Sequence, residues 1–186
     1  GNSLIATSSG FSVTFLATGN SAAATTLLSN SSTSQNGTAG LPAGAPPSVR
    51  VTDANGNPVA GVSISFAVSG GGGSILPVTP IATNASGIAT LTQWVLGTVA
   101  GANTVTASAA GLTPSQLTFT ATGAAGAAAQ LQVQTQPSSS AQSGVALAVQ
   151  PTVRLADVFG NPVTTNGTVV TAALGILIYW RHRANI

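Results

Sequence analysis

The fold is decided by the stretch Val49-Arg-Val-Thr-Asp-Ala-Asn-Gly-Asn-Pro-Val59, which returns 104 residues later as Val153-Arg-Leu-Ala-Asp-Val-Phe-Gly-Asn-Pro-Val163. A second pair of segments keeps the same spacing: Thr14-Phe-Leu-Ala-Thr-Gly19 and Thr118-Phe-Thr-Ala-Thr-Gly123. Two landmarks at one offset indicate an internal repeat rather than a chance similarity.

The repeat divides the 186-residue chain into three parts. Residues 20–123 form the one complete copy. Residues 1–19 match the end of that copy, so we expect them to be the terminal strands of a partial repeat. Residues 124–186 begin a further copy, but their last twelve residues match nothing earlier in the chain and are apolar and basic. The sequence therefore predicts one complete domain flanked by two partial copies.

Alternation of apolar and polar residues predicts β-strands. The clearest case is 62–68, where Val, Ile, Phe and Val alternate with Ser, Ser and Ala. The Gly-rich stretch 69–74 is expected to be a loop between strands, although it resembles a flexible linker. Further strands are expected at 48–53, 88–96, 104–109 and 117–121, with an Asn-Gly turn at 53–58. Short strands separated by turns, without a helical period, predict an all-β, antiparallel β-sandwich.

Composition excludes several classes of protein. Only 3% of the residues are charged, and the net charge of +2 comes from Arg181 and Arg183 near the end. A nucleic-acid partner requires a basic stripe, which is not present. The chain has no cysteine, which excludes thiol redox motifs and cysteine-type zinc sites. We expect no cofactor.

The sequence offers no catalytic constellation. The only carboxylates, Asp53 and Asp157, occupy the same position in two repeats and cannot share one cleft. The single histidine, His182, lies between two arginines. Asp53, Asn55 and Asn57 have the spacing of a calcium loop, but a proline follows where that loop needs glycine. A turn-capping role for Asp53 is favoured over calcium, and we expect the protein not to be an enzyme.

Four motifs in sequence order carry a family resemblance: VTDANGNPVAGVSISFAV (51–68), GGGGS (70–74), NASGIATLTQWVLG (84–97), and GANTVTASAAGL with LTFTATG (101–123). Together they resemble the bacterial Ig-like repeats of the invasin and intimin type (Big-1). The resemblance covers nearly all of residues 1–174. It implies Ig-like β-sandwiches in tandem on an extracellular bacterial surface protein, where most copies act as rod-like spacers.

The segment from Val169 to Trp180 is apolar or nearly so and is followed by Arg-His-Arg. A membrane anchor with a cationic stop would need about 20 apolar residues, and this segment has twelve. A buried strand is therefore the favoured interpretation.

Two partial copies at opposite ends of a complete domain suggest assembly. The strands of residues 1–19 in one subunit are of the kind that the 124–186 unit of the next subunit needs, so strand addition would build a head-to-tail filament. The residues expected at this contact are Leu4, Ile5, Phe11, Val13, Phe15, Val169, Val170, Ile176, Leu177, Ile178, Tyr179 and Trp180.

Two other functions remain open. The chain would also suit a spacer or stalk segment of a tandem Ig-like adhesin, with neighbouring Ig-like repeats as its partners. A carbohydrate- or receptor-binding module would have Trp94, Tyr179 and Trp180 as possible sugar platforms. We expect Trp94 to be a core anchor instead. The first two functions both predict a location at the bacterial cell surface.

Overall fold

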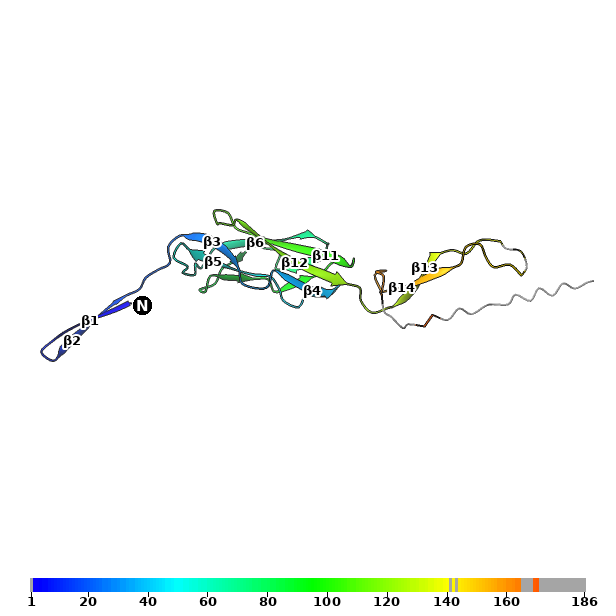
Figure 1. Cartoon of the computed structure of the whole chain (residues 1–186). Coiled ribbons are helices and arrows are strands. Elements are labelled where there is room, and N and C mark those ends of the chain that lie inside the picture. Colours follow the sequence, from blue (N-terminus) through cyan, green and yellow to red (C-terminus); the bar gives the residue numbers. More distant parts are fainter. Residues whose placement is uncertain (1, 141, 143, 165–168, 171–186) are drawn as a thin grey trace, which may run out of the picture.

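The protein is described by a computed structural model that covers residues 2–140, 142, 144–164 and 169–170. Every regular element in this part of the chain is a β-strand, as the alternation predicts. Three units follow one another: a hairpin, a central sandwich, and a short two-stranded unit (Figure 1). No helix within the described residues is long and apolar enough to cross a membrane.

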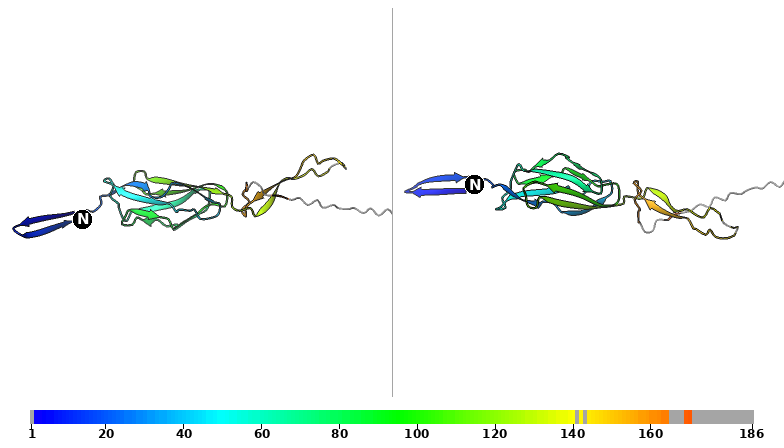
Figure 2. Two further views of the ribbon diagram at one scale, coloured as in Figure 1. Left: turned by 60° about the horizontal axis from the view of Figure 1, so that its bottom comes forward. Right: turned by 90° about the horizontal axis from the view of Figure 1, so that it is seen from above.

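The central domain is a sandwich of two main sheets (Figure 2). Its larger sheet has the order β4-β12-β11-β6-β8, formed by Ser34–Thr38, Gln116–Ala124, Gly101–Ser108, Ser63–Gly70 and Ile81–Ala82. Its smaller sheet has the order β3-β5-β9, formed by Ala24–Ser29, Ser48–Asp53 and Ile88–Thr90. A two-stranded ribbon, β7 (Ser74–Leu76) with β10 (Gln93–Val95), accompanies them.

The strand order is that of an immunoglobulin sandwich. Strands β3, β5 and β9 take the places of A, B and E, and β6, β11 and β12 take those of C, F and G. Strand β4 runs parallel to β12 at the edge of the larger sheet, while the neighbouring pairs are antiparallel. The fold is therefore all-β and Ig-like, as expected.

The core follows directly from the alternation of side chains along the strands. In β6, Ile64 and Phe66 are buried while Ser63 and Ser65 are exposed. The central side chains come from both sheets and from the ribbon; those fully buried or nearly so include Leu27, Val49, Val51, Ile64, Leu91, Trp94, Leu96, Val105 and Phe119. Trp94 is only 1% exposed, as expected of a core anchor. Burial of these groups is the main driving force for closing the two sheets on each other.

The prediction of a single strand over 88–96 is wrong. The segment forms β9, which pairs with β5, and then β10, which pairs with β7. The reason is a change of phase: Ala89 and Leu91 are buried two residues apart, but the next buried residue is Trp94, three further on. That shift carries the chain from the smaller sheet to the ribbon.

The Gly-rich stretch is a turn inside the domain, as predicted. Strand β6 continues through Gly70, β7 begins at Ser74, and Gly73 adopts a φ of 86°. A β-carbon on Gly73 would collide with the carbonyl oxygen of Val95. Only glycine fits both the left-handed backbone and this close approach.

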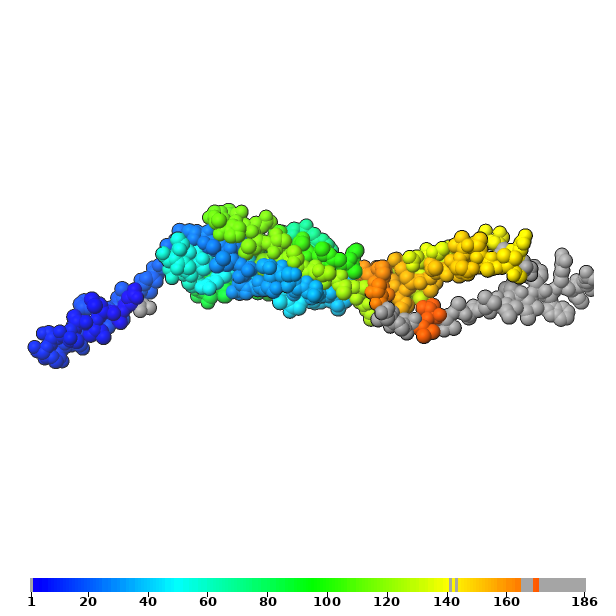
Figure 3. Space-filling model, in the orientation of Figure 1, coloured from blue at the N-terminus to red at the C-terminus, as the bar shows by residue number. Residues whose placement is uncertain are grey.

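The two flanking units are β-ribbons. Strands β1 (Asn2–Ser8) and β2 (Phe11–Ala17) form an antiparallel hairpin that leaves one end of the sandwich. Strands β13 (Gln130–Thr135) and β14 (Thr152–Ala156) form a second antiparallel pair beyond the opposite end. Figure 3 shows the hairpin as a thin arm beside the thicker central domain.

Candidate interaction surfaces

The β1–β2 hairpin presents apolar side chains to solvent. Its two-residue turn is Ser9-Gly10, with φ values of 48° and 88°, the conformation that matches the twist of a hairpin. Leu4 lies opposite Phe15, and Ala6 lies opposite Val13, on one face of the hairpin. Every residue of both strands is exposed.

All five interaction residues expected in this hairpin are exposed, but they do not share a face. Leu4, Val13 and Phe15 lie together, whereas Ile5 points to the other face because successive strand residues alternate. Phe11 begins β2 beside the turn. The relative exposures are 68% for Leu4, 59% for Ile5, 79% for Phe11, 56% for Val13 and 56% for Phe15.

The hairpin has the same pairing register as β11 and β12 of the central domain. There Val105 lies opposite Phe119, as Leu4 lies opposite Phe15 in the hairpin. Val105 is 0% and Phe119 1% exposed, because the smaller sheet covers them. The hairpin thus displays a surface that the central domain buries.

The β13–β14 pair shows the same relationship to β3 and β5. Leu27 lies opposite Val51 in the central domain, and Leu131 lies opposite Leu155 in the second unit. Leu27 is 0% exposed, whereas Leu131 is 57% exposed. Both flanking units are therefore pairs of strands with an exposed apolar face. Exposed apolar patches and unpaired strand edges are typical of surfaces that bind another chain.

The expected contact in the C-terminal segment is only partly within the described residues. Val169 and Val170 are 86% and 45% exposed and belong to no strand, so the predicted buried strand is not formed there. A strand can be buried only if a facing sheet covers it, and the described part of this unit consists of one two-stranded ribbon. The expected contact residues Ile176, Leu177, Ile178, Tyr179 and Trp180 lie outside the described residues, as does His182.

Asp53 caps the turn that follows β5. Its Oδ1 accepts the backbone N–H groups of Asn55 and Asn57, each at 2.9 Å. Its Oδ2 accepts the Asn57 side-chain amide at 3.0 Å and the backbone N–H of Ala22 at 2.9 Å. The Asn57 amide above all, together with the Ala22 N–H, lowers the pKa of Asp53 to about 2.

These contacts are those of a turn cap. Each carboxylate oxygen of Asp53 already faces two N–H donors, an arrangement that opposes a cation at the same oxygens. In the described residues no three His, Cys, Asp or Glu side chains gather as metal ligands. The Ala22 contact also ties the segment that enters the domain to this turn.

The equivalent turn after β14 has the same internal hydrogen bonds and also contacts the central domain. Asp157 accepts the backbone N–H groups of Phe159, Asn161 and Gly126, each at 2.9 Å, and the Asn161 side-chain amide at 2.8 Å. Burial alone would raise the pKa of Asp157, but these hydrogen bonds outweigh it and lower the pKa to about 2.

Asn161 joins this turn to the central domain. Its side-chain Nδ2 donates to the carbonyl of Thr98 at 2.8 Å, and its Oδ1 accepts the N–H of Ala100 at 2.8 Å. The Phe159 ring lies against Gly40 of the same domain. Sequence reasoning missed this contact; the one signal was that the turn keeps an asparagine at the same place in both copies, Asn57 and Asn161.

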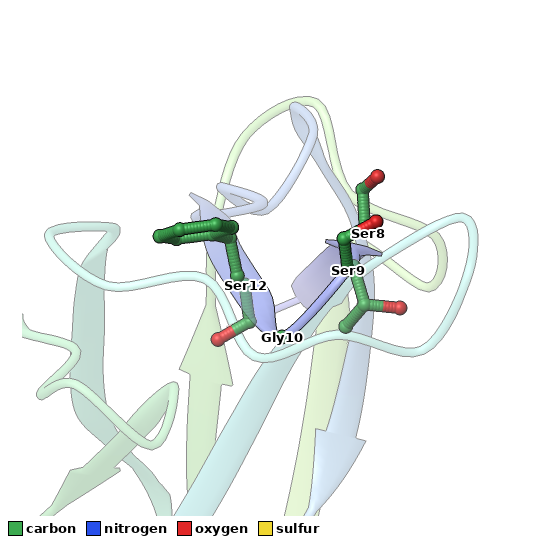
Figure 4. A pocket seen from close by; sticks show the side chains of 6 residues that line it. Ser8, Ser9, Gly10 and Ser12 are labelled. Carbon is green, nitrogen blue, oxygen red and sulfur yellow. The ribbon is translucent and has the colours of Figure 1, made fainter.

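A further candidate site is a hollow within the described residues. A shallow hollow at the tip of the β1–β2 hairpin is shown in Figure 4; it is lined by Thr7, Ser8, Ser9, Gly10, Phe11 and Ser12. None of these side chains is an acid, a base or a thiol. Trp94 is buried and so presents no platform to a sugar, and the other two candidate platforms lie outside the described residues.

Comparison with known proteins agrees with the fold. The family model of the bacterial Ig-like domain (group 1) matches residues 45–133. The resemblance seen in the motifs is thereby confirmed for these residues. No curated protein matches the chain.

Three solved structures have some similarity to the chain. The D00–D0 domain of intimin is 23% identical, with 53% of this chain and 44% of that chain covered and a TM-score of 0.37. Domains 1–6 of the surface layer protein SbsC are 18% identical, with 82% and 18% covered and a TM-score of 0.41. The Escherichia coli adhesin FdeC is 19% identical, with 82% and 46% covered and a TM-score of 0.47. The chain spans less than half the length of each of these structures.

Proposed function

We propose that this chain is a non-enzymatic structural segment of a bacterial surface protein, built from Ig-like units and assembled head to tail by strand complementation. The observation that carries the proposal is the matched pair of incomplete units. The hairpin has the register of β11–β12, and β13–β14 has the register of β3–β5. In the central domain, β11 and β12 belong to the larger sheet, and β3 and β5 belong to the smaller sheet that packs against it.

In the central domain the corresponding pairs contact each other directly. The N–H of Thr113, in the loop before β12, donates to the carbonyl of Thr25 in β3 at 2.8 Å, and Thr26 forms a bridge with Thr113. Phe119 and Leu27 belong to one buried core. A hairpin and a β13–β14 unit brought together in this way would cover each other's apolar faces.

The two incomplete units lie beyond opposite ends of the central domain (Figure 2). In the proposed assembly, the hairpin of one molecule pairs with the β13–β14 unit of a second molecule rather than with its own. Such a contact joins unlike surfaces and does not close, so repetition produces a filament. Strand addition of this kind combines main-chain hydrogen bonds with pockets for alternate side chains.

A second candidate is a spacer in a longer stalk of tandem Ig-like repeats. The contact of Asn161 with Thr98 and Ala100 favours it, because this contact fixes one unit against the next within a single chain. In that setting neighbouring repeats of the same chain would complete the flanking units. Both candidates are structural, and both agree with a location at the cell surface.

Size-exclusion chromatography followed by negative-stain electron microscopy of the purified 186-residue chain separates the two candidates. Regular filaments, lost on deletion of residues 1–19, would support complementation between molecules. A monodisperse monomer at all concentrations would contradict it and leave the spacer. The deletion variant needs a folded control, which far-UV circular dichroism of the central domain supplies.

A further inference from the structure

The contact made by Asn161 is built from parts that are fixed on both sides. On the side of the turn, Asp157 holds the Asn161 side chain through its Oδ2. On the side of the central domain, the loop 97–101 is held from the core: the buried Asn103 accepts the N–H of Gly97 at 2.8 Å and donates to the carbonyl of Gly101 at 3.1 Å. The Asn161 carboxamide thus binds both the carbonyl of Thr98 and the N–H of Ala100, which lie two residues apart in this loop.

The Asp53–Pro58 turn, at the other end of the central domain, has the same hydrogen bonds that hold the Asn161 side chain in the Asp157 turn. Asp53 makes the same four hydrogen bonds as Asp157: to the N–H groups two and four residues on, to an asparagine side chain, and to the entering segment. Asn57 therefore has the orientation that Asn161 has.

The two asparagines differ in what they reach. Asn161 is 7% exposed and bonds to Thr98 and Ala100. Asn57 is exposed, and within the described residues its Oδ1 has no hydrogen bond. The difference lies outside the turn: the Asp157 turn follows the central sandwich, whereas the described unit that precedes the domain of the Asp53 turn is the β1–β2 hairpin.

We propose that the Asp53–Pro58 turn is a docking site for the junction loop of a preceding Ig-like repeat, a loop of the 97–101 type. Asn57 binds the carbonyl and N–H of that loop as Asn161 binds those of Thr98 and Ala100. The occupant is identified by its chemistry: an exposed carbonyl and an amide donor two residues later, presented at the end of a sandwich.

The second contact of the junction predicts a difference between the two sites. At the occupied junction Phe159 lies against Gly40, and the corresponding residue of the free turn is Asn55. The docking site at Asp53–Pro58 therefore lacks the apolar contact and depends more heavily on the Asn57 carboxamide. Substitution of Asn57 should loosen its junction more than substitution of Asn161 loosens the other.

The inference rests on the end-to-end stacking of Ig-like repeats in the second candidate of the proposed function, the spacer, and is independent of strand complementation. It is tested in the full chain carrying a second copy of residues 20–123 inserted after Gly19, so that a complete repeat precedes the original Asn57. The natural chain has no cysteine, so two spin labels can be placed without removing native residues of that type. Thr118→Cys in the inserted repeat and Ser29→Cys in the repeat that follows use exposed strand positions.

The distance distribution between the labels is measured by pulsed electron paramagnetic resonance on monomeric protein. We expect one narrow distribution in the parent and a distribution about twofold wider with Asn57→Ala in the following repeat, since domains without a specific contact move relative to each other. The matched control is the same substitution in the inserted repeat, whose turn faces only the hairpin; it should leave the distribution narrow.

Two results would overturn the inference: no broadening with Asn57→Ala in the following repeat, or equal broadening with the control substitution. Filament formation plays no part in this readout. Failure to polymerise would thus count against strand complementation and leave the docking site standing.

Discussion

Leu4 lies directly opposite Phe15 in the β1–β2 hairpin, and both side chains are exposed, at 68% and 56%. The same pairing in the central domain places Val105 against Phe119 in the core. A cross-strand apolar pair of this kind stabilises a sheet chiefly when its face is covered. The hairpin therefore exposes an apolar face of the kind that the central domain buries in its core.

Replacing Phe15 with aspartate should abolish filament assembly and leave the thermal unfolding of the central domain unchanged. A charge at this position would have to be buried on complementation, which costs several kcal/mol, whereas in the free hairpin it stays in water. Sedimentation velocity and electron microscopy report assembly, and circular dichroism reports unfolding.

Ser12→Asp is the matched control, because it adds the same charge on the opposite face of β2, where its cross-strand partner is Thr7 and not an expected contact residue. This variant should still assemble. Assembly by the Phe15 variant would remove the hairpin from the contact, and loss of assembly by both variants would point to charge alone rather than to the apolar face.

Leu27 and Leu131 occupy the same position in two units and should respond differently to truncation. Leu27 is fully buried, so Leu27→Ala should lower the free energy of unfolding of the central domain by about 2–5 kcal/mol. Leu131 is 57% exposed, so Leu131→Ala in the monomer should change that free energy by less than about 0.5 kcal/mol. Urea titration followed by far-UV circular dichroism measures both; equal losses would mean that Leu131 is covered in solution.

The sequence predicted those parts of the fold that depend on local patterns. Two-residue alternation located β6 and β12, because each has one face in the core and one in solvent. The repeat offset placed the turn at Asp53. Trp94 was expected in the core because a tryptophan in such a strand is more often a core anchor than a platform for a ligand.

The remainder depends on contacts between distant residues. The break between β9 and β10 arises because Leu91, just after β9, and Trp94, in β10, must both be buried in the core. The bond between Asn161 and Thr98 joins residues 63 positions apart, and a carboxamide that bonds to backbone leaves no signature in its partner's side chain. The repeated asparagine could have indicated a shared role, but not the partner.

Acid should destabilise the central domain over a narrow pH range set by Asp53. Its pKa is about 2 in the folded chain against an ordinary value of 3.8. A lowered folded pKa contributes stability that is fully present above the unfolded pKa and is lost as the pH falls through the folded pKa. The free energy of unfolding should therefore be flat from neutral pH to about 5 and decline between about 4.5 and 2.

Asp53→Asn tests this assignment, because the only other acidic side chain is Asp157, in the following unit. The variant should be less stable at neutral pH and should lose most of the acid slope of the central domain. Asp157→Asn should keep that slope. Persistence of the full slope in the Asp53 variant would show that another group is responsible.

Gly97 lies where the junction loop crosses the Gly-rich turn, and an alanine there should damage both. A β-carbon on Gly97 would overlap the carbonyl oxygen of Gly71, so Gly97→Ala must displace backbone on one side or the other. Forcing extra volume into a closely packed site costs about 1–3 kcal/mol. Because Thr98 and Ala100 follow directly, the displacement should also weaken their bonds to Asn161, and the amide of Ala100 should exchange faster with solvent.

Gly44→Ala provides the comparison. A β-carbon on Gly44 would have the Gln35 Oε1 as its nearest neighbour, at 3.9 Å, and this glycine does not have a positive φ. Its replacement should leave both the unfolding midpoint in urea and the exchange rate of the Ala100 amide unchanged. If Gly97→Ala loses stability but the Ala100 amide does not exchange faster, the loop keeps its conformation at the junction. In that case Asn103, rather than the Gly97–Gly71 contact, determines the positions of Thr98 and Ala100 relative to Asn161.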